Sequence, residues 1–578
     1  MLTTAEAALA IADIVHEGFD TFYGEFHRIT REARRWFDAR EWSRVDDLHH
    51  ARIDLYQSYV VRTLTRLRPI TRAFPEHIGV WHEAHRAYVA LVHGRIDREV
   101  AKTFFNAITR KIFRTRGVNA QVEFLDHELD TADLAPAPGQ IRRVVEHDSA
   151  SAFASVMQQV RPALAWQDPQ RDAAWLQARH LEHCATQGLA PEVRRIDVLE
   201  TLFFRAREGY VVARIHGAEG PRPLLVPVQP TQSGTVVDGA LFTVEAMLQV
   251  FSSTRAYFFV DVSKPADVVE FLGTLMPQLT ESERYIAIAH HRHGKSLIHR
   301  ELMAHLRHST DRFVMAPGIP GLVMTVFTLR SYRNVFKLIR DRFEKPSATR
   351  EGILRSYRDV FRGRRVGRLA DTQEFEHLAF ELRRFEPECL AELQARAGNS
   401  VRVEGDQVVV SHLYIEEKMT PFNLYLEQTT IEQAEAAMID YGFAIKELAG
   451  HNIFAGDLLW KNFGVTAHGR LVLYDYDEIC PLLVCNFRHI PEPRTIEEEF
   501  SDQPFYAVAD ADVFPAEWAP FIVPREPRLR AAFLAHHADL LTPEFWREKQ
   551  AEVAAGAVHL GLPYLPRFPA LQPVAPAT

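Results

Sequence analysis

The sequence predicts an α+β protein in which a mainly helical N-terminal domain with a small sheet precedes a C-terminal domain of two lobes. Between Leu2 and about Leu125, apolar residues recur every three to five positions with charged residues between them, as in amphipathic helices. Beyond Arg312, short apolar runs of strand character alternate with glycine turns and with longer helical patterns. The chain has 578 residues, which is enough for several domains.

The composition excludes several functional classes. Hydrophobic residues make up 47% and charged residues 25%, and the net charge of −9 creates no basic field for nucleic acid or a membrane surface. The four cysteines form no CxxC pair, the N-terminus has no basic signal-peptide region, and no apolar run approaches the roughly 20 residues of a membrane span. We therefore expect a cytoplasmic protein with no nucleic-acid and no membrane partner.

The N-terminal domain is expected to span residues 1–310. Its helical patterns continue through Trp42–Leu67, His77–His93 and Asp97–Phe113, and Asp133–Gly139 has the proline and glycine content of a loop. Helices and strands then mix: we expect helices at 149–160, 172–187, 265–279 and 295–306, and strands at 209–216, 223–228 and 256–262.

A short cluster, His290–Ser296, ends in Gly-Lys-Ser like a phosphate-binding P-loop. That motif requires another glycine five residues before Gly294, where Ala289 stands, and no strand leads directly into it. We interpret the cluster as the polar start of a helix.

The first motif with chemical content is a glycine turn followed by a lysine. Ala316–Leu322 contains two glycines between the apolar runs 313–315 and 323–329, and Lys337 lies in a third run, 335–339. Glycines let a backbone approach an anion closely, and a lysine in an apolar strand needs an anionic partner because burying an ammonium group is costly. The phosphates of ATP suit both features, although a plain hairpin also explains the glycines.

Asp371 stands at the start of a segment with helical apolar spacing. The inward-facing residues of that helix would be Phe375, Leu378 and Leu382. Asp371 would then be its N-cap, which is the favoured role on the residues alone. The opposite side of the helix offers Glu374 and Glu381 as partners for Lys337, and the sequence does not choose between them.

The next segments predict a connection between two lobes. Val401–Val410 has the pattern of a hairpin, and His412–Met419 predicts a strand that runs into a hinge where adenine would bond to backbone. Ile431–Leu448 predicts a long amphipathic helix that ends at Gly450.

Three polar residues follow that helix at a spacing typical of phosphoryl transfer. Asp457 precedes Asn462 by five positions, and Asp475 follows Asn462 by 475 − 462 = 13 positions. One carboxylate is needed to accept the hydroxyl proton, and an Asn and another carboxylate are needed to hold Mg²⁺; Asp477 is a further carboxylate that could touch the metal. Because all these motifs occur in the order of a bilobal kinase, the sequence predicts a kinase-like phosphotransferase.

Some details depart from an ordinary protein kinase. No His-Arg pair precedes Asp457, Lys461 follows it by four positions, and a Pro- and acid-rich insert, Asn486–Pro527, replaces the expected Ala-Pro-Glu. Two alternatives are a small-molecule kinase of the aminoglycoside or choline type and a pseudokinase scaffold. The long N-terminal domain and the insert argue against the first, and the complete set of catalytic residue types argues against the second.

The chain resembles the isocitrate dehydrogenase kinase/phosphatase family, bifunctional bacterial enzymes at the branch to the glyoxylate bypass. The matching motifs are Ala316–Gly321, Val335–Ile339, Ala370–Phe375, His412–Glu416, Gly456–Val465 and Tyr474–Cys480. The resemblance implies an enzyme that phosphorylates a serine of isocitrate dehydrogenase with ATP, which inactivates it, and that removes the phosphate again. It runs nearly end to end and leaves only the Pro-rich tail 561–578 unmatched, which we expect to be disordered.

The resemblance also implies roles for individual residues. The loop that cradles ATP would be Ala316, Pro317, Gly318, Ile319, Pro320, Gly321 and Leu322, and Lys337 would contact the phosphates. Asp457 would be the kinase base, helped by Lys461, while Asn462 and Asp475 would hold Mg²⁺. Asp371 would serve the phosphatase reaction, a role that replaces the N-cap preferred above.

The family further implies ADP for the phosphatase reaction and AMP as an allosteric effector of a regulatory domain at 1–310. The catalytic domain would span 311–560, with an insert near 486–525 that reaches the active site of isocitrate dehydrogenase. The oligomeric state is left open, with a homodimer as one expectation.

Overall fold

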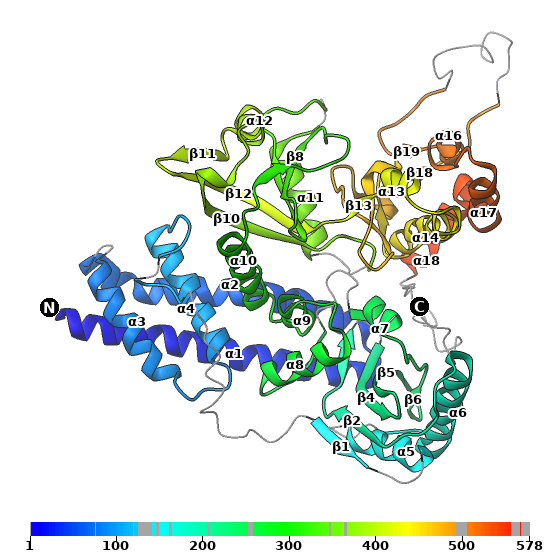
Figure 1. Ribbon diagram of the computed structural model, residues 1–578, viewed down its shortest axis with the longest axis horizontal. Coiled ribbons are helices and arrows are strands. Elements are labelled where there is room, and N and C mark those ends of the chain that lie inside the picture. Colours follow the sequence, from blue (N-terminus) through cyan, green and yellow to red (C-terminus); the bar gives the residue numbers. More distant parts are fainter. Residues whose placement is uncertain are drawn as a thin grey trace. The chain divides into compact units, whose positions relative to one another are not determined.

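The computed structural model describes residues 2–74, 77–119, 121–124, 141–145, 149–160, 165–205, 208–251, 258–345, 348–362, 367–492, 506–555 and 567. The chain divides into an N-terminal unit, mainly Met1–Thr310, and a C-terminal unit, mainly Asp311–Glu376 with Glu381–Gly561. Each unit combines helices with a sheet (Figure 1), which confirms the α+β prediction. Among the described residues, no helix is both long and apolar enough to cross a bilayer.

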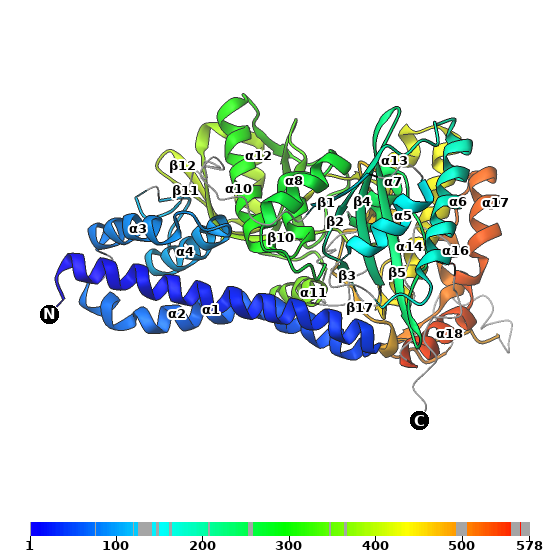
Figure 2. The same ribbon diagram turned by 90° about the horizontal axis from the view of Figure 1, so that it is seen from below.

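Helices open the N-terminal unit: α1 (Thr4–Ala39), α2 (Trp42–Ala73), α3 (Ile78–Val92) and α4 (Arg98–Phe113). The long helices α1 and α2 lie side by side (Figure 2). Thr3 and Glu6 form a capping box at the start of α1, and the rings of Phe22 and Phe104 stack 5.9 Å apart in the core. The apolar spacing therefore predicted these helices correctly.

A sheet with covering helices completes this unit. The elements are β1 (Ile141–Val144), α5 (Ser149–Gln159), α6 (Pro169–Gln187), β2 (Arg195–Leu199), β3 (Phe203–Arg205), β4 (Glu208–Gly217), β5 (Gly220–Thr231), β6 (Gly234–Val237), α7 (Val244–Phe251), α8 (Pro265–Leu275), α9 (Glu281–Ala287) and α10 (His291–His308). The strand order is β1-β2-β4-β5-β6, with β3 paired to β4, and neighbouring strands are antiparallel.

Two expectations for this unit have definite outcomes. The strand expected at 256–262 is wrong for its described part, where only an isolated bridge joins Phe259 to Phe204. The cluster around Gly294 lies in the first turn of α10, as predicted, and an added Cβ on Gly294 would meet the Ser282 carbonyl oxygen at 2.8 Å. Gly294 is thus required by helix packing. The loop expected at Asp133–Gly139 lies outside the described residues.

The first lobe of the C-terminal unit is built around a sheet. Its elements are β7 (Phe313–Met315), β8 (Met324–Leu329), β9 (Asn334–Ile339), α11 (Arg350–Arg362), β10 (Thr372–Glu381), the short 3₁₀ turn η2 (Leu382–Arg384), α12 (Pro387–Ala397), β11 (Val401–Glu404) and β12 (Gln407–Glu417). The strand order is β10-β12-β9-β8-β7, with β11 paired to β12. The predicted hairpin at Val401–Val410 is confirmed, with Gly405 in its turn at φ 64°.

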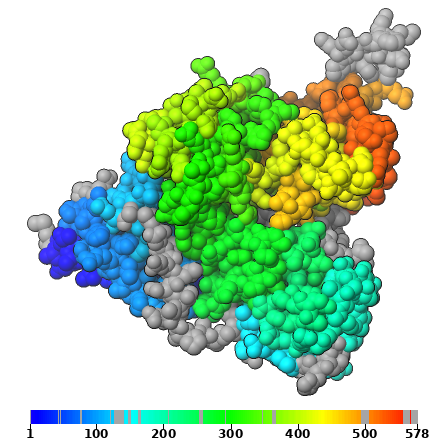
Figure 3. Space-filling model, viewed as in Figure 1, coloured from blue at the N-terminus to red at the C-terminus, as the bar shows by residue number. Residues whose placement is uncertain are grey.

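The second lobe is mainly helical. Its elements are β13 (Thr420–Pro421), α13 (Phe422–Gln428), α14 (Ile431–Gly450), β14 (Ile453–Phe454), η3 (Trp460–Asn462), β15 (Phe463–Val465), β16 (Leu471–Leu473), β17 (Cys480–Pro481), η4 (Leu482–Val484), β18 (Asn486–Phe487), β19 (Asp512–Val513), η5 (Pro515–Trp518), α16 (Ala519–Ile522), α17 (Pro527–His537), η6 (Ala538–Leu541) and α18 (Pro543–Ala554). Side chains fill the spaces that the ribbon leaves between the elements of each unit (Figure 3).

The helix expected after Asp371 is wrong, because these residues form strand β10. From Gln373 onward, burial along the strand alternates except near His377, a non-glycine residue with a φ of 54°. Two exposed residues in succession place buried Phe375 and Leu378 three positions apart, which imitates helical spacing. With no helix there, the N-cap interpretation of Asp371 is also wrong.

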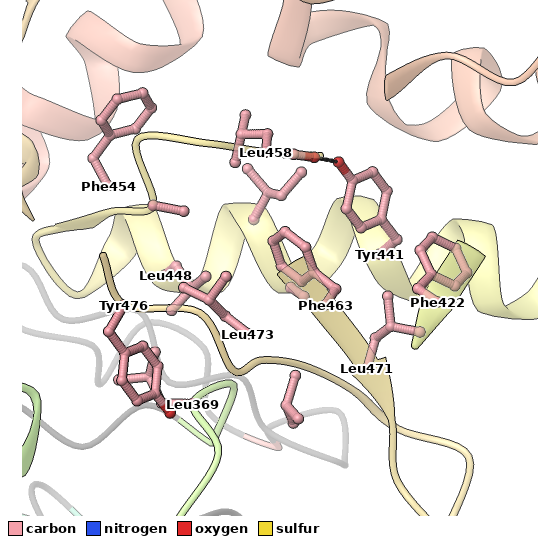
Figure 4. Packing of buried hydrophobic residues seen from close by; sticks show 14 of the residues in the cluster. Leu369, Phe422, Tyr441, Leu448, Phe454, Leu458, Phe463, Leu471, Leu473 and Tyr476 are labelled. Atoms are coloured by element: carbon pink, nitrogen blue, oxygen red, sulfur yellow. Dashed lines mark hydrogen bonds between the residues drawn. The ribbon is translucent and has the colours of Figure 1, made fainter. Parts of the chain in front are cut away.

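A hydrophobic core fixes the loop that follows α14 (Figure 4). Leu458, 5% exposed, inserts among Tyr441, Phe463 and Leu473, and the Tyr441 hydroxyl donates a hydrogen bond to the Leu458 carbonyl. Tyr476 packs in the same cluster and donates to the Ala370 carbonyl at 2.7 Å. The core therefore holds residues 457–462 and 474–477 on rigid supports.

The expected insert and tail lie partly outside the described residues. Within the insert, β18 and β19 pair in parallel, with Asn486 opposite Asp512, while residues 493–505 are not described. Of the tail, only Arg567 is described; its guanidinium donates to Asp172 at 2.7 Å and its amide to the Asp238 carbonyl at 2.8 Å.

Candidate active site

A pocket of about 480 Å³ opens between the two lobes of the C-terminal unit. Its walls include the loop Ala316–Leu322 from the first lobe and four polar residues from the second, Asp457, Lys461, Asn462 and Asp475. Lys337 lines it as well, so the pocket collects every residue proposed from the sequence for ATP, metal and proton transfer. Asp371 is not among the lining residues.

The glycine loop crosses the pocket between β7 and β8. Gly318 has a φ of 118°, a conformation that residues with a side chain rarely adopt. A Cβ on Gly321 would approach the Met324 carbonyl oxygen to 3.1 Å, whereas Ile319 is 65% exposed at the tip. This loop therefore offers backbone, rather than bulky side chains, to a ligand beneath it.

Lys337 is held at the centre of the first lobe's sheet by a carboxylate on the neighbouring strand. On β9 it lies opposite Tyr414 of β12, and its Nζ is 2.6 Å from Glu416 Oε2. The same Nζ donates to the Tyr474 carbonyl at 2.8 Å and lies 5.0 Å from the centre of the Tyr474 ring. A buried ammonium group with these contacts is fixed in position and faces the cavity.

The expected partners of Lys337 are wrong. Glu374 bonds to His412 at 2.7 Å, and Glu381 bonds to Arg383 at 2.8 Å. The true partner, Glu416, follows three apolar residues in the expected strand 412–419, so the argument that identified Lys337, a charge next to apolar strand residues, could also have made Glu416 a candidate.

The catalytic-type loop lies between β14 and β15. Asp457 Oδ1 accepts a hydrogen bond from the Leu459 amide at 2.9 Å, and the Asn462 side chain donates to the Asp457 carbonyl at 3.3 Å. Gly456, with a φ of 73°, packs so closely that an added Cβ would meet the Glu478 carbonyl oxygen at 2.5 Å. The loop's own hydrogen bonds thus orient the Asp457 carboxylate and Asn462.

The register of β15 and β16 brings the loop to the two carboxylates. The Tyr474 amide donates to the Asn462 carbonyl at 3.1 Å, which places Asp475 directly after this contact. The Asp477 amide donates to Asp475 Oδ1 at 3.3 Å. Asn462, Asp475 and Asp477 therefore line one end of the pocket together.

This end of the pocket places two carboxylates close together. Burial, and then the charge of Asp475, raise the pKa of Asp477 to about 7, although Lys345 and Lys337 act in the opposite direction. Asp477 Oδ1 is buried and has no hydrogen-bond partner among the described residues. Two carboxylates and an amide oxygen are the hard donors that Mg²⁺ prefers, so the residues present fit that ion.

Some pocket residues were not identified from the sequence. Lys345, ion-paired with Glu478, lines the cavity, and so do Glu388, Glu392 and Arg396 of α12. They lie in segments without a recognisable motif, so only the fold brings them to the site.

Asp371 lies just before β10. Its Oδ2 accepts a hydrogen bond from the Gln373 side chain at 2.9 Å. The preceding residue, Ala370, donates its amide to the Leu473 carbonyl at 2.9 Å and so joins this segment to the last residue of β16, two positions before Asp475.

Comparison with known proteins gives one consistent result. Residues 12–310 match the regulatory-domain model, and residues 311–566 the kinase-domain model, of isocitrate dehydrogenase kinase/phosphatase (AceK). Proteins named isocitrate dehydrogenase kinase/phosphatase from Anaeromyxobacter sp. (strain Fw109-5) and Anaeromyxobacter dehalogenans (strain 2CP-C) are 37% and 39% identical over 97% and 96% of this chain, and 97% of each relative is covered. A relative of the same name from Xanthomonas euvesicatoria pv. vesicatoria is 37% identical over 94% of this chain and 95% of its own length. With both family models matched in order, the chain belongs to the isocitrate dehydrogenase kinase/phosphatase family.

Proposed function

We propose that this protein transfers a phosphoryl group from ATP to a serine of isocitrate dehydrogenase, which inactivates that enzyme, and that it also removes the phosphate. The balance of the two reactions would divide carbon between the tricarboxylic acid cycle and the glyoxylate bypass. The observation that carries the proposal is the single pocket that holds Lys337, Asp457, Asn462 and Asp475 in a chain that matches the family along nearly its whole length.

In the forward reaction, Asp457 accepts the proton of the serine hydroxyl as that oxygen attacks the γ-phosphorus of ATP. Lys461, four residues further on in the same loop, neutralises charge that develops on the transferred group. Lys337, fixed by Glu416, and the backbone of Ala316–Leu322 position the phosphates. Asn462 and Asp475, with Asp477 beside them, would hold Mg²⁺, which would supply further charge neutralisation.

For the phosphatase reaction we propose a role of Asp371 in positioning water, together with ADP as a required nucleotide. The phosphoserine would return its phosphoryl group to ADP, and water would then cleave the ATP formed to ADP and phosphate. Ala370 links the Asp371 segment to the end of β16, two residues before Asp475, which supports action on the same ligand.

We further propose that residues 1–310 form the regulatory domain and respond to AMP, and that the segment near 486–525 recognises isocitrate dehydrogenase in the cytoplasm. The alternatives from the sequence are less well supported. A small-molecule kinase would not need the N-terminal 310 residues, which match the family's regulatory-domain model. A scaffold would not need the paired Lys337 and Glu416.

The test follows labelled phosphate from ATP to purified isocitrate dehydrogenase and then chases the label with ADP. We expect Asp457→Asn to abolish labelling and Asp371→Asn to label normally but to retain the label during the chase. Glu374→Gln is the matched control, because Glu374 bonds to His412 and does not line the pocket. Absence of labelling by an ATP-binding wild type would contradict the kinase assignment, and undiminished phosphate release without nucleotide would contradict the ADP-dependent route.

A further inference from the structure

Two cysteines lie side by side close to the candidate active site. Their Sγ atoms, in Cys480 and Cys485, are 3.6 Å apart, and both residues are half-buried free thiols. The other two cysteines of the chain, Cys184 and Cys389, are buried. Only the first pair therefore combines a close partner with access to small molecules from solvent.

The backbone around this pair is well fixed. Cys480 of β17 pairs with Phe454 of β14, and the Cys485 amide donates to the Leu482 carbonyl at 3.2 Å. The Gln550 side chain donates to the carbonyls of Leu482 and Cys485 at 2.8 and 2.7 Å. A disulfide needs sulfurs about 2.05 Å apart, so a further approach of roughly 1.5 Å suffices, within reach of a side-chain rotation and a small backbone shift.

The two thiols are chemically unequal. A hydrogen bond from the Cys485 thiol lowers the pKa of Cys480, against the opposing effects of burial and the charge of Glu478. The same bond, with burial, raises the pKa of Cys485. Cys480 is thus the better source of thiolate, and Cys485 keeps its proton as the second thiol of the pair.

We propose that Cys480 and Cys485 form an oxidation site that a hydroperoxide converts to an intramolecular disulfide, and that this disulfide slows phosphoryl transfer. The Cys480 thiolate attacks one peroxide oxygen; an S–O bond forms, the O–O bond breaks, and the alcohol or water leaves with the proton that Cys480 released. The Cys485 sulfur then attacks the sulfenic sulfur; the S–S bond forms, and the hydroxyl group leaves as water with the Cys485 proton. Two thiols lose two electrons, and the peroxide is reduced by two. A dithiol reverses the reaction by exchange.

The consequence for activity follows from the strand that carries Cys480. Its partner β14 leads directly into Gly456 and Asp457, and Gly456 packs against Glu478 with no room for even one added carbon atom. A displacement of Cys480 on disulfide formation would therefore also displace the loop that orients Asp457. This part of the inference rests on the proposed function, whereas disulfide formation does not.

The experiment treats the full chain with hydrogen peroxide and then blocks remaining thiols with an alkylating agent. Mass spectrometry of the intact protein and its peptides should show the loss of two hydrogen atoms and a peptide linked through Cys480 and Cys485. The labelling rate of isocitrate dehydrogenase should fall several-fold and return after a dithiol is added. Cys485→Ser should form no disulfide and should trap sulfenic acid at Cys480, detectable with dimedone, while Cys389→Ala should behave like wild type.

Separate alkylation of Cys480 and Cys485 after peroxide treatment would overturn the oxidation site, even if the kinase assignment holds. A disulfide that forms while the labelling rate stays unchanged would overturn the proposed effect on transfer. A wild type that never labels isocitrate dehydrogenase would count against the proposed function, and the mass measurement would still decide the fate of the thiols.

Discussion

Two carboxylates, one in each unit, show how differently this molecule treats negative charge. Asp197, on β2 of the N-terminal unit, lies within 2.9 Å of Arg195, Arg214 and His216. Burial alone raises its pKa, but hydrogen bonds from these three residues outweigh burial, and the pKa of Asp197 lies below its ordinary value. Asp477 in the pocket faces another carboxylate, and its pKa rises to about 7.

The difference separates a carboxylate that the fold pairs with cations from one that the fold places beside another carboxylate. Around Asp197, cations satisfy the carboxylate within the fold, so the group stabilises the folded chain. Around Asp477, the fold places the second carboxylate Asp475, and a bound cation would neutralise the negative charge of the pair. Without a cation, ionisation of Asp477 lowers the stability of the folded chain. Ionising Asp477 next to Asp475 is therefore unfavourable, and we propose that a bound cation relieves this cost.

The largest expected effect concerns Lys337. Among the described residues of the C-terminal unit, it is the only lysine buried at the centre of the first lobe's sheet. Lys337→Met should lower the rate of phosphate transfer roughly a hundred- to thousandfold, because one fixed charge on the phosphates is lost. Transfer of label from ATP measures this. Lys446→Met is the control, since Lys446 pairs with Asp539 at 2.7 Å outside the pocket; equal losses in both variants would contradict the assignment.

A second large effect should appear in stability. Arg368 is buried and donates to both Asp440 and Glu447, at 2.6 to 2.9 Å. Arg368→Met leaves two carboxylates facing each other and should lower the free energy of unfolding of the C-terminal unit by about 3 kcal/mol. Denaturant unfolding followed by tryptophan fluorescence measures the change, and a loss under about 1 kcal/mol would show that the pairs are dispensable.

The pH dependence of stability should have opposite signs at the two carboxylates. In Mg²⁺-free buffer, Asp477 keeps a proton in the folded state between its ordinary pKa of 3.8 and about 7, whereas the unfolded chain has released it. The free energy of unfolding should therefore fall as pH rises through this window, and Asp477→Asn should remove roughly 2 kcal/mol of that fall.

Asp197 should behave in the reverse way. Its stabilisation is present above the unfolded pKa of 3.8 and is lost as pH falls through the lower pKa of the folded state. Asp197→Asn should therefore destabilise at neutral pH and have little effect in strong acid. Unfolding curves at a series of pH values measure both variants, and equal signs for the two would contradict the comparison.

The smallest effect is expected at the surface. Arg528 bonds to Glu432 and Glu435, but all three side chains are substantially exposed to solvent. Arg528→Ala should leave the free energy of unfolding almost unchanged, and added salt should reduce the small difference further. A larger, salt-independent loss would show that exposed pairs matter as much as the buried Arg368 network.

Local patterns predicted a large part of this molecule. Apolar spacing identified α1 to α4 and α14, and sequence motifs identified the glycine loop, Lys337, Asp457, Asn462 and Asp475, because each motif lies within a short stretch of chain. Long-range pairing was not accessible in the same way. Glu416 and Lys337 are 416 − 337 = 79 positions apart in the chain and meet only through the register of β9 and β12.

Two errors came from local irregularity. The left-handed backbone at His377 gave a strand the apolar spacing of a helix, and this error led to the wrong partners for Lys337. The apolar run near Phe259 suggested a strand, but only one bridge forms there. The left-handed backbone at His377 has no clear sequence signal, since histidine does not favour a positive φ as glycine does. The apolar run near Phe259 likewise does not show that its strand is missing.

The stored negative charge of the pocket can be tested by thermal unfolding with ATP, with and without Mg²⁺. We expect ATP to raise the melting temperature of the wild type and Asp197→Asn strongly only when Mg²⁺ is present, because ligand binding to the folded state adds stability by mass action. Asp475→Asn should lose the Mg²⁺-dependent part of the shift. A shift in Asp475→Asn as large and as Mg²⁺-dependent as in the wild type would contradict a metal-nucleotide site at these carboxylates.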